Sequence, residues 1–322
     1  MSAAGLDWQA ELQPIFIGAG DALAGRSVGA IGTHRAVVRS TDHKVLGVVG
    51  RDFTPLQNVE AFGQFDPLVQ SGELTYEAAG SLKGGAVVWV LATLRDGTVE
   101  VTPGDAVRKH VLLAHGHDGS MSIRAGFTTI RVVCANTLGA AMKRDAESLL
   151  TVKHTSGVKV NLEKAFDVLD MQRGELKAEA ERYRFLASKK CDDKNLVRYV
   201  RETLKPGSAD DDKIKVRQVD EICELFKTGR GSELSRGTMW GAFNAVTEFG
   251  THDRGHNQDS RQTSNWFGDG VKLAQRALDV AVAFAETAPD AACLGRQCYD
   301  NSATAKADFA ALLGRPYLSA AE

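Results

Sequence analysis

The sequence predicts an α+β protein in which an N-terminal antiparallel β-meander with one early helix precedes a mainly helical C-terminal half. Two observations predict it. Up to about residue 134, short β-branched runs alternate with polar turns, as at 34–40 and 44–50. From Asn136 onward, apolar residues instead recur at the 3.6-residue period of a helix. We therefore expect a β-rich domain at 1–150 and a helical region at 151–322 that can pack on it as one unit.

The strands of the first half are bounded by turn residues. Lys83-Gly84-Gly85 separates two apolar runs and predicts a hairpin. A phosphate-binding loop would need Lys directly after its second glycine, where this chain has Ala86. Asp96-Gly97 predicts a further turn. Strands are expected at 34–40, 44–50, 72–82, 86–94, 98–101, 107–117 and 125–135.

Helices are predicted from apolar stripes. In the first half, Val59, Phe62, Leu68 and Val69 indicate about three helical turns that end at Gly72. In the second half the stripes are longer, and PGSADDD at 206–212 interrupts them as a loop. Helices are expected from Asn136 or Thr137 to Arg144 and at 158–187, 194–204, 214–228, 238–249, 265–288 and 303–313.

Composition excludes several classes of protein. The 322 residues carry 39 Lys and Arg against 41 Asp and Glu, so a polybasic, histone-like protein is excluded. Five cysteines without a CxxC pair argue against a disulfide framework or a cysteine-rich zinc module. No apolar run approaches the roughly 20 residues that a membrane helix needs. We expect no signal peptide, a cytoplasmic location and no membrane partner.

One polar run resembles a metal site. His252 and His256 are four residues apart, as in HExxH, and Asp253 and Asp259 supply carboxylates. Gly255 argues against a continuous helix there, so the simpler interpretation is a polar loop between helices, and no cofactor is expected. His115 and His117 alternate on a predicted strand and are expected to face solvent.

Basic residues gather where strands give way to helices. This set is the candidate nucleic-acid contact: Arg124, Arg131, Lys143, Arg144, Lys153, His154 and Lys159. A second set, Lys190, Lys194, Arg198 and Arg201, shares one predicted helix face. For that set a solvated helix face is the simpler interpretation. Tyr183 and Tyr199 interleave with it, but aromatic residues at helical spacing are more often part of the core.

Several segments together resemble a known family. They are YEAAGSLKGGAVVWVLATL (76–94), TTIRVVCANTL (128–138), VKHTSGV (152–158), TMWGAFNAVTEFGTHDR (238–254) and NWFGDGVKLAQRAL (265–278). The chain resembles the phage/plasmid-like protein family, a domain of unknown function found on mobile elements, over roughly residues 30 to 290. That family has no assigned catalytic residues. In layout the chain is also similar to phage single-strand-annealing proteins of the Red-beta type, which build oligomeric rings or helical filaments and hold single-stranded DNA in a basic groove.

The resemblance implies a non-enzymatic protein that binds single-stranded DNA and anneals strands in phage or plasmid recombination, as a homo-oligomeric ring or filament. In this hypothesis the seven basic residues neutralise phosphates and leave base edges free. Two alternatives stay open. One is a metal-dependent nucleic-acid enzyme that uses the polar cluster at 252–259. The other is a structural, oligomeric protein of a mobile element, assembled through the helices predicted at 158–187 and 265–288.

Overall fold

The computed structural model describes residues 2–18, 27–121, 123–138, 151–152, 162–205 and 216–291. Its strands form two antiparallel meanders, one in the order β1-β2-β3 and the other in the order β4-β5-β6-β7-β8. This confirms the predicted α+β class and its antiparallel sheet. The first sheet comprises β1 (Ala10–Gly18), β2 (Ser27–Arg39) and β3 (Val45–Gly50). The second comprises β4 (Leu74–Leu82), β5 (Val87–Thr102), β6 (Asp105–Gly116), β7 (Ile123–Arg131) and β8 (Thr151–Val152).

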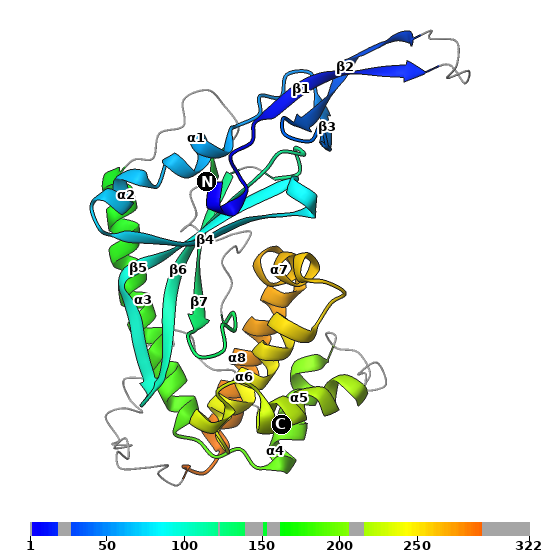
Figure 1. Cartoon of the computed structure of the whole chain (residues 1–322). Coiled ribbons are helices and arrows are strands. Elements are labelled where there is room, and N and C mark those ends of the chain that lie inside the picture. Colours follow the sequence, from blue (N-terminus) through cyan, green and yellow to red (C-terminus); the bar gives the residue numbers. More distant parts are fainter. Residues whose placement is uncertain are drawn as a thin grey trace, which may run out of the picture.

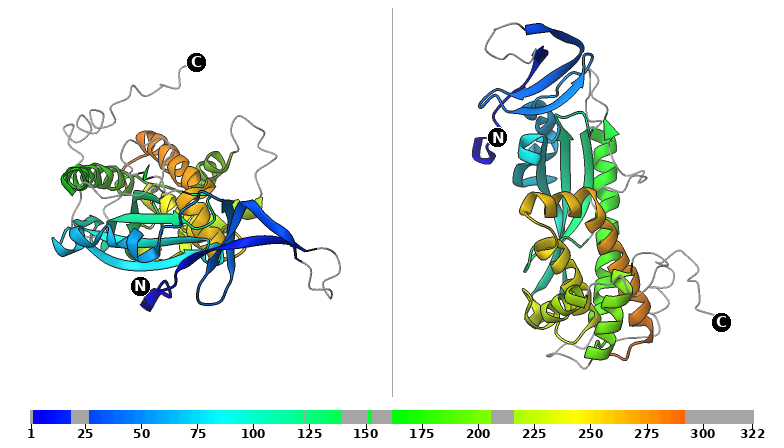
Figure 2. Two further views of the ribbon diagram at one scale, coloured as in Figure 1. Left: turned by 90° about the horizontal axis from the view of Figure 1, so that it is seen from above. Right: turned by 90° about the vertical axis from the view of Figure 1, so that its right-hand side faces the viewer.

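The smaller sheet projects from the end of the molecule, beyond the larger sheet (Figures 1 and 2). Its strand β1 was not predicted from the sequence. β1 pairs along β2, from Ala10 opposite Arg39 to Gly18 opposite Ser27, with register shifts on either side of Phe16. Because Pro14 and these irregularities interrupt the alternation of apolar and polar residues, the segment lacks the period-2 pattern by which a strand is recognised.

In the first half, one predicted helix and one predicted turn differ from the structure. The helix predicted from Val59 to Val69 is divided into α1 (Asn58–Gly63) and α2 (Asp66–Gln70). Pro67 lies in the first turn of α2, where the backbone N–H that proline lacks would have no partner within the helix. Inside one continuous helix the same proline would remove a hydrogen bond and clash with the preceding turn, so the helix is divided here. The turn predicted at Asp96-Gly97 is a bulge within β5, where the register shifts between Thr93 and Thr98 and Asp96 has a φ of 55°.

The helical half confirms most of its predicted elements. It contains α3 (Leu162–Ala187), α4 (Asp193–Leu204), α5 (Val216–Thr228), α6 (Met239–Glu248), α7 (Gln258–Phe267) and α8 (Asp269–Thr287). The helix predicted at 265–288 begins only at Asp269, because the backbone at Gly268 is not helical and separates α7 from α8. A π-helical turn, Phe249–Asp253, extends α6. The helix predicted at 303–313, the loop at 206–212 and residues 139–144 lie outside the described residues.

A shared core joins the sheet to the helices. Val101 and Val107 of the larger sheet belong to the same buried cluster as Leu186 of α3 and Trp240 and Phe243 of α6. Every residue of α6 is buried, so this helix lies at the centre of the helical half. α3 runs along the sheet and continues into the helical bundle (Figure 1). A second cluster packs the other end of the sheet against α1 and α2. No helix in the described part of the chain is long and apolar enough to cross a membrane.

Two helical glycines are expected to respond in opposite directions to replacement by alanine. A Cβ at Gly241 in α6 would overlap the carbonyl oxygen of Ser235, whereas a Cβ at Gly174 in α3 would meet nothing within 4 Å. We expect Gly174→Ala to raise the free energy of unfolding by about 0.5–1 kcal/mol, through its higher helix propensity. Gly241→Ala should lower it by about 1–3 kcal/mol, as overpacking does. Urea titrations of both variants test this. A stabilising Gly241→Ala would show that the contact relaxes freely.

Candidate nucleic-acid interface

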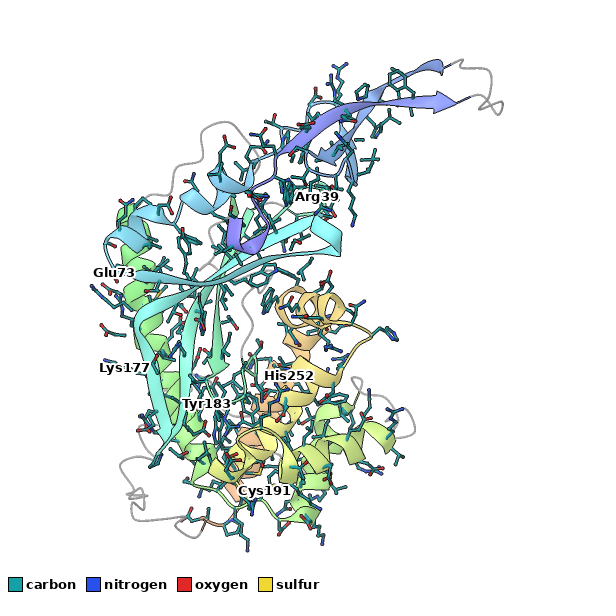
Figure 3. The ribbon with its side chains drawn as sticks, in the orientation of Figure 1. Arg39, Glu73, Lys177, Tyr183, Cys191 and His252 are labelled. Atoms are coloured by element: carbon teal, nitrogen blue, oxygen red, sulfur yellow. The ribbon has the colours of Figure 1, made fainter. Side chains whose placement is uncertain are left out.

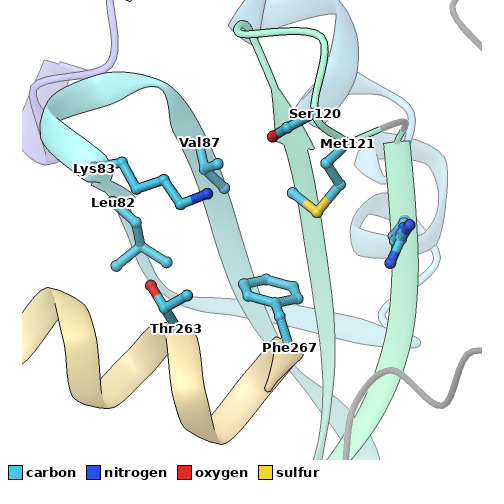
Figure 4. A pocket seen from close by; sticks show the side chains of 8 residues that line it. Leu82, Lys83, Val87, Ser120, Met121, Thr263 and Phe267 are labelled. Atoms are coloured by element: carbon cyan, nitrogen blue, oxygen red, sulfur yellow. The ribbon is translucent and has the colours of Figure 1, made fainter. Parts of the chain in front are cut away.

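The β4–β5 hairpin turn, the start of β7 and helix α7 enclose a cavity of about 220 Å³. The predicted hairpin is confirmed, with Leu82 opposite Val87 across the turn. Lys83 takes a φ of 51° within that turn, in the left-handed region. We call this site the α7 cavity, and Figure 4 shows the side chains that line it. They are Leu82, Lys83, Val87, Ser120, Met121, Arg124, Thr263 and Phe267.

Contacts between distant segments hold α7 over the sheet. Trp266 of α7 packs edge-to-face on Trp89 of β5, with ring centroids 4.8 Å apart. The carboxylate of Asp259 accepts the backbone N–H of Lys83 at 3.1 Å, which ties the start of α7 to the hairpin turn. Asn257 caps α7 by accepting the N–H of Ser260 at 2.8 Å. The wall of the cavity is therefore held by packing, a helix cap and a charge-assisted hydrogen bond.

The cavity combines two cations with hydroxyl groups and apolar side chains. Neither Lys83 nor Arg124 forms an ion pair within the described part of the chain, although most other arginines of the sheet have carboxylate partners. Thr263 contributes a hydroxyl group, and Phe267 contributes an aromatic ring (Figure 4). The hydroxyl of Ser120 donates to Asp118 at 2.6 Å. Unpaired cations beside a ring are the chemistry that holds a phosphodiester chain and stacks on a base.

A further cation approaches the same turn. Lys44 directly precedes β3, and its ammonium lies so close to Gly84 that a Cβ atom added to Gly84 would overlap with it. Arg39 lies near Gly85, but its guanidinium bonds both carboxylate oxygens of Asp42 at 2.8 and 2.7 Å. Lys44 and Lys83 thus meet at the same hairpin turn from different strands, while Arg124 lines the cavity from β7. The carboxylates of Asp259 and Asp118 contact Lys83 and Ser120 of the lining, so the cavity carries charges of both signs.

The structure describes two of the seven predicted basic residues, Arg124 and Arg131, and one of these two lines the cavity. Arg124 does so, and strand β8 pairs beside it, with Thr151 opposite Arg124. The others, Arg131 apart, lie outside the described residues: Lys143, Arg144, Lys153, His154 and Lys159.

The predicted phosphate contact by Arg131 is wrong. Its side chain is 1% exposed, and its guanidinium bonds both oxygens of Asp105, at 2.7 and 2.5 Å. Burial by itself would lower the pKa of Arg131, but the bonds to the Asp105 carboxylate raise it above its usual value. Trp240 donates to the same carboxylate at 2.8 Å. Arg131 is thus a buried link between the sheet and α6.

The predicted solvent exposure of His115 and His117 is also wrong, because both imidazoles are buried. The second half of β6 is buried on both faces of the sheet, so the alternation of side chains along the strand does not distinguish a solvent-exposed face from a buried face. His117 bonds the side chain of Asn58 at 2.8 Å, and its ring lies 4.9 Å from that of Trp8. These histidines therefore join the sheet to α1 and the N-terminal segment.

Buried His110 makes stability depend on pH. Its Nε2 lies 2.8 Å from a carboxylate oxygen of Glu77, but burial outweighs this partner and lowers the pKa of His110. The unfolded chain therefore binds the proton more readily, and the free energy of unfolding should fall as pH drops below about 6.5. Denaturation between pH 7 and 5 should show a weaker pH dependence for His110→Gln than for the exposed control His256→Gln. Equal dependence in the two variants would contradict this.

The residues of the alternative metal site do not converge. His252 donates to the carbonyl oxygen of Cys134 at 3.0 Å, and Asp259 accepts from Lys83. Among the described residues, which include all four predicted ligands, no group of three or more His, Cys, Asp or Glu side chains is placed to hold a metal ion. His252 instead ties the π-helical turn to the segment after β7.

Sequence reasoning did not identify the rest of the α7 cavity. The sequence predicts Lys83 only as part of a hairpin turn and Phe267 only as part of the helix at 265–288. Thr263 and Ser120 carry no local pattern at all. The one usable signal was a lysine at the tip of a predicted hairpin, because such turns lie at the surface, where binding residues are common.

Comparison with known proteins identifies one family and no individual relative. A family model described as "Domain of unknown function (DUF932)" matches residues 45–277. These residues include β4–β8, the hairpin turn and all of α7. No curated protein and no solved structure matches the chain.

Proposed function

The chain belongs to this family of unknown function, whose description names no activity, and from the geometry of the site we propose that it binds single-stranded DNA. The observation that carries the proposal is the α7 cavity, which is lined by the ring of Phe267 and by two cations, Lys83 and Arg124, that form no ion pair with any residue the structure describes. Cations that neutralise phosphates and a ring that stacks on bases are the two parts of a single-strand site.

The cavity favours a single strand over a duplex. The cavity lies between a hairpin turn and a helix and has a volume of about 220 Å³. A space of this size admits a group such as a single base, whereas a base-paired duplex is too wide to enter it. A flexible strand can insert one base against Phe267 while its phosphates contact Lys83 and Arg124. Stacking on one aromatic ring is worth about 1–3 kcal/mol per base and does not depend on sequence. We therefore expect binding that tolerates any sequence.

The proposal includes strand annealing by a homo-oligomer acting in the cytoplasm, in recombination of mobile elements. A protein that holds a strand mainly by its phosphates leaves most base edges free to pair with a complementary strand. No bond is made or broken in this process, so the chain needs no nucleophile and no cofactor. The alternative of a purely structural protein is less well supported, because the apolar side chains described on α8 and on the C-terminal half of α3 are already buried within this chain.

Fluorescence anisotropy tests the proposal. A labelled single-stranded 30-mer and a duplex of the same sequence are titrated with the protein at 50 mM and 200 mM salt. We expect tighter binding of the single strand and a steep loss of affinity at the higher salt, as counterion release requires. Failure to bind the single strand at 50 mM salt would overturn the proposed function.

A further inference from the structure

A second cationic surface lies far from the α7 cavity, where α4 meets the C-terminal end of α8. A hollow of about 380 Å³ opens there, lined among others by Lys190, Asn195, Arg198, Phe284 and Thr287. Four exposed cations lie in or beside it. Three are on α4, but Lys190, predicted to share their helix face, instead precedes the helix in a β-bridge with Thr238. We call this set the α4 row: Lys190, Lys194, Arg198 and Arg201.

No member of the α4 row forms an ion pair within the described ranges, although carboxylates are close by. The side chain of Asp192 caps α4 by accepting the N–H of Asn195 at 2.8 Å. Glu202 pairs with Lys205 at 2.9 Å. Because these acids are engaged elsewhere, the cations of the row keep their capacity to bind an external anion.

Arg198 is also held in place. Its guanidinium lies over the ring of Phe284, with the Cζ atom 5.7 Å from the ring centroid. Stacking fixes the plane of the guanidinium, and its N–H groups have no hydrogen-bond partner among the residues that the structure describes. A planar donor set of this kind binds a phosphate through two parallel hydrogen bonds. Tyr183 and Tyr199 do not contribute to this surface, because both rings are buried in the core, as predicted. Figure 3 labels Tyr183.

The shape of the row indicates a linear polyanion. Lys194, Arg198 and Arg201 follow one face of α4, and the helix rise places the first and last about 10 Å apart. A single small anion would use one or two of these cations. A phosphodiester backbone presents charges at regular intervals and can contact the whole row.

The α4 row and the α7 cavity lie at opposite ends of α8. Phe267 of the cavity precedes the first residue of α8 by two positions, and Thr287 of the hollow is its last residue. A helix of 19 residues is about 28 Å long. A very short oligonucleotide therefore cannot contact both sites at once.

We propose that the α4 row is a second binding site for a nucleic-acid backbone, so that one chain holds two strand segments, one at each end of α8. This rests on the proposed function for the identity of the polyanion. It adds a physical route to annealing, because two strands held by the same chain meet at a high effective concentration.

Counting the bound copies of a short oligonucleotide tests the inference. Equilibrium dialysis of dT4, which is too short to span α8, measures the number bound per chain at low salt. The wild-type protein is compared with Lys190→Glu/Arg198→Glu, with Lys83→Glu/Arg124→Glu, and with a control that reverses two exposed lysines outside both sites, Lys177→Glu/Lys227→Glu. A second variant, Lys194→Glu/Arg201→Glu, leaves the Arg198–Phe284 contact intact, and circular dichroism checks the fold of each.

We expect two bound dT4 per chain for the wild type and the control, and one for each site variant. One dT4 per wild-type chain that is lost only in the Lys83/Arg124 variant would overturn the second site and leave the proposed function standing. One dT4 that is lost only in the α4 variants would support the α4 row and overturn the α7 cavity. No binding by the wild type would overturn both.

Discussion

Replacing Asp105 by Asn should lower the free energy of unfolding by about 3–5 kcal/mol, because it leaves a buried charge uncompensated. The carboxylate of Asp105 is fully buried and bonds the guanidinium of Arg131 through both oxygens. It also accepts the indole N–H of Trp240. Arg131 in turn donates to the carbonyl oxygen of Gly231 at 2.9 Å. The Asp105–Arg131 ion pair thus connects β6, β7, α6 and the segment before α6.

Urea denaturation followed by circular dichroism measures the effect. The matched control is Glu221→Gln, which removes the carboxylate of the exposed pair Arg217–Glu221. Exposed pairs of this kind contribute at most about 1 kcal/mol. If Asp105→Asn cost no more than the control, the buried ion pair would not be the link between sheet and helices that its geometry indicates.

The second large effect concerns DNA. The double reversal Lys83→Glu/Arg124→Glu should weaken single-strand binding by at least about tenfold at 50 mM salt, since two attractive contacts become repulsive. The neutral double variant Lys83→Ala/Arg124→Ala should lower the slope of log affinity against log salt by about 1.4, at about 0.7 per phosphate for a single strand. Anisotropy titrations across a salt series measure both quantities.

The control for this prediction is Lys177→Glu on α3, which makes the same change of charge as the single variant Lys83→Glu. Lys177 is exposed and points away from the molecule, on the outer side of α3 (Figure 3). We expect this variant to bind the single strand almost as the wild type does. Equal losses in Lys177→Glu and in a single Lys83→Glu variant would mean that only the net charge matters and that the α7 cavity is not the site.

The two predictions assign two arginines of β7 to different roles, one in folding and one in binding. Arg131 and Arg124 lie seven residues apart on one strand, and both were predicted to contact phosphates. The structure buries Arg131 against Asp105 and leaves Arg124 at the cavity. An arginine's role depends on its partner, and here the partner of Arg131 lies on the neighbouring strand, 26 residues earlier. No local pattern around Arg131 reports that contact.

Local sequence determined the elements of this protein. Turn residues such as Lys83-Gly84-Gly85 and the apolar spacing of α3–α6 depend on interactions within a few residues, so the α+β class and most boundaries could be predicted. The errors of the sequence-based prediction also have local causes. Pro67 and Gly268 interrupt helices whose apolar stripes continue across them, and at Asp96 a bulge replaces a turn.

Only the tertiary structure decided which side chains meet. The α7 cavity joins Lys83 to Thr263, about 180 residues along the chain, and His115 and His117 are buried because α1 and Trp8 cover their strand. Burial and charge pairing are properties of such long-range contacts, and periodicity carries no record of them. The sequence alone therefore determined that strands precede helices and that cations are present. The packing of α7 against the sheet decided which cations remain free to bind an anion.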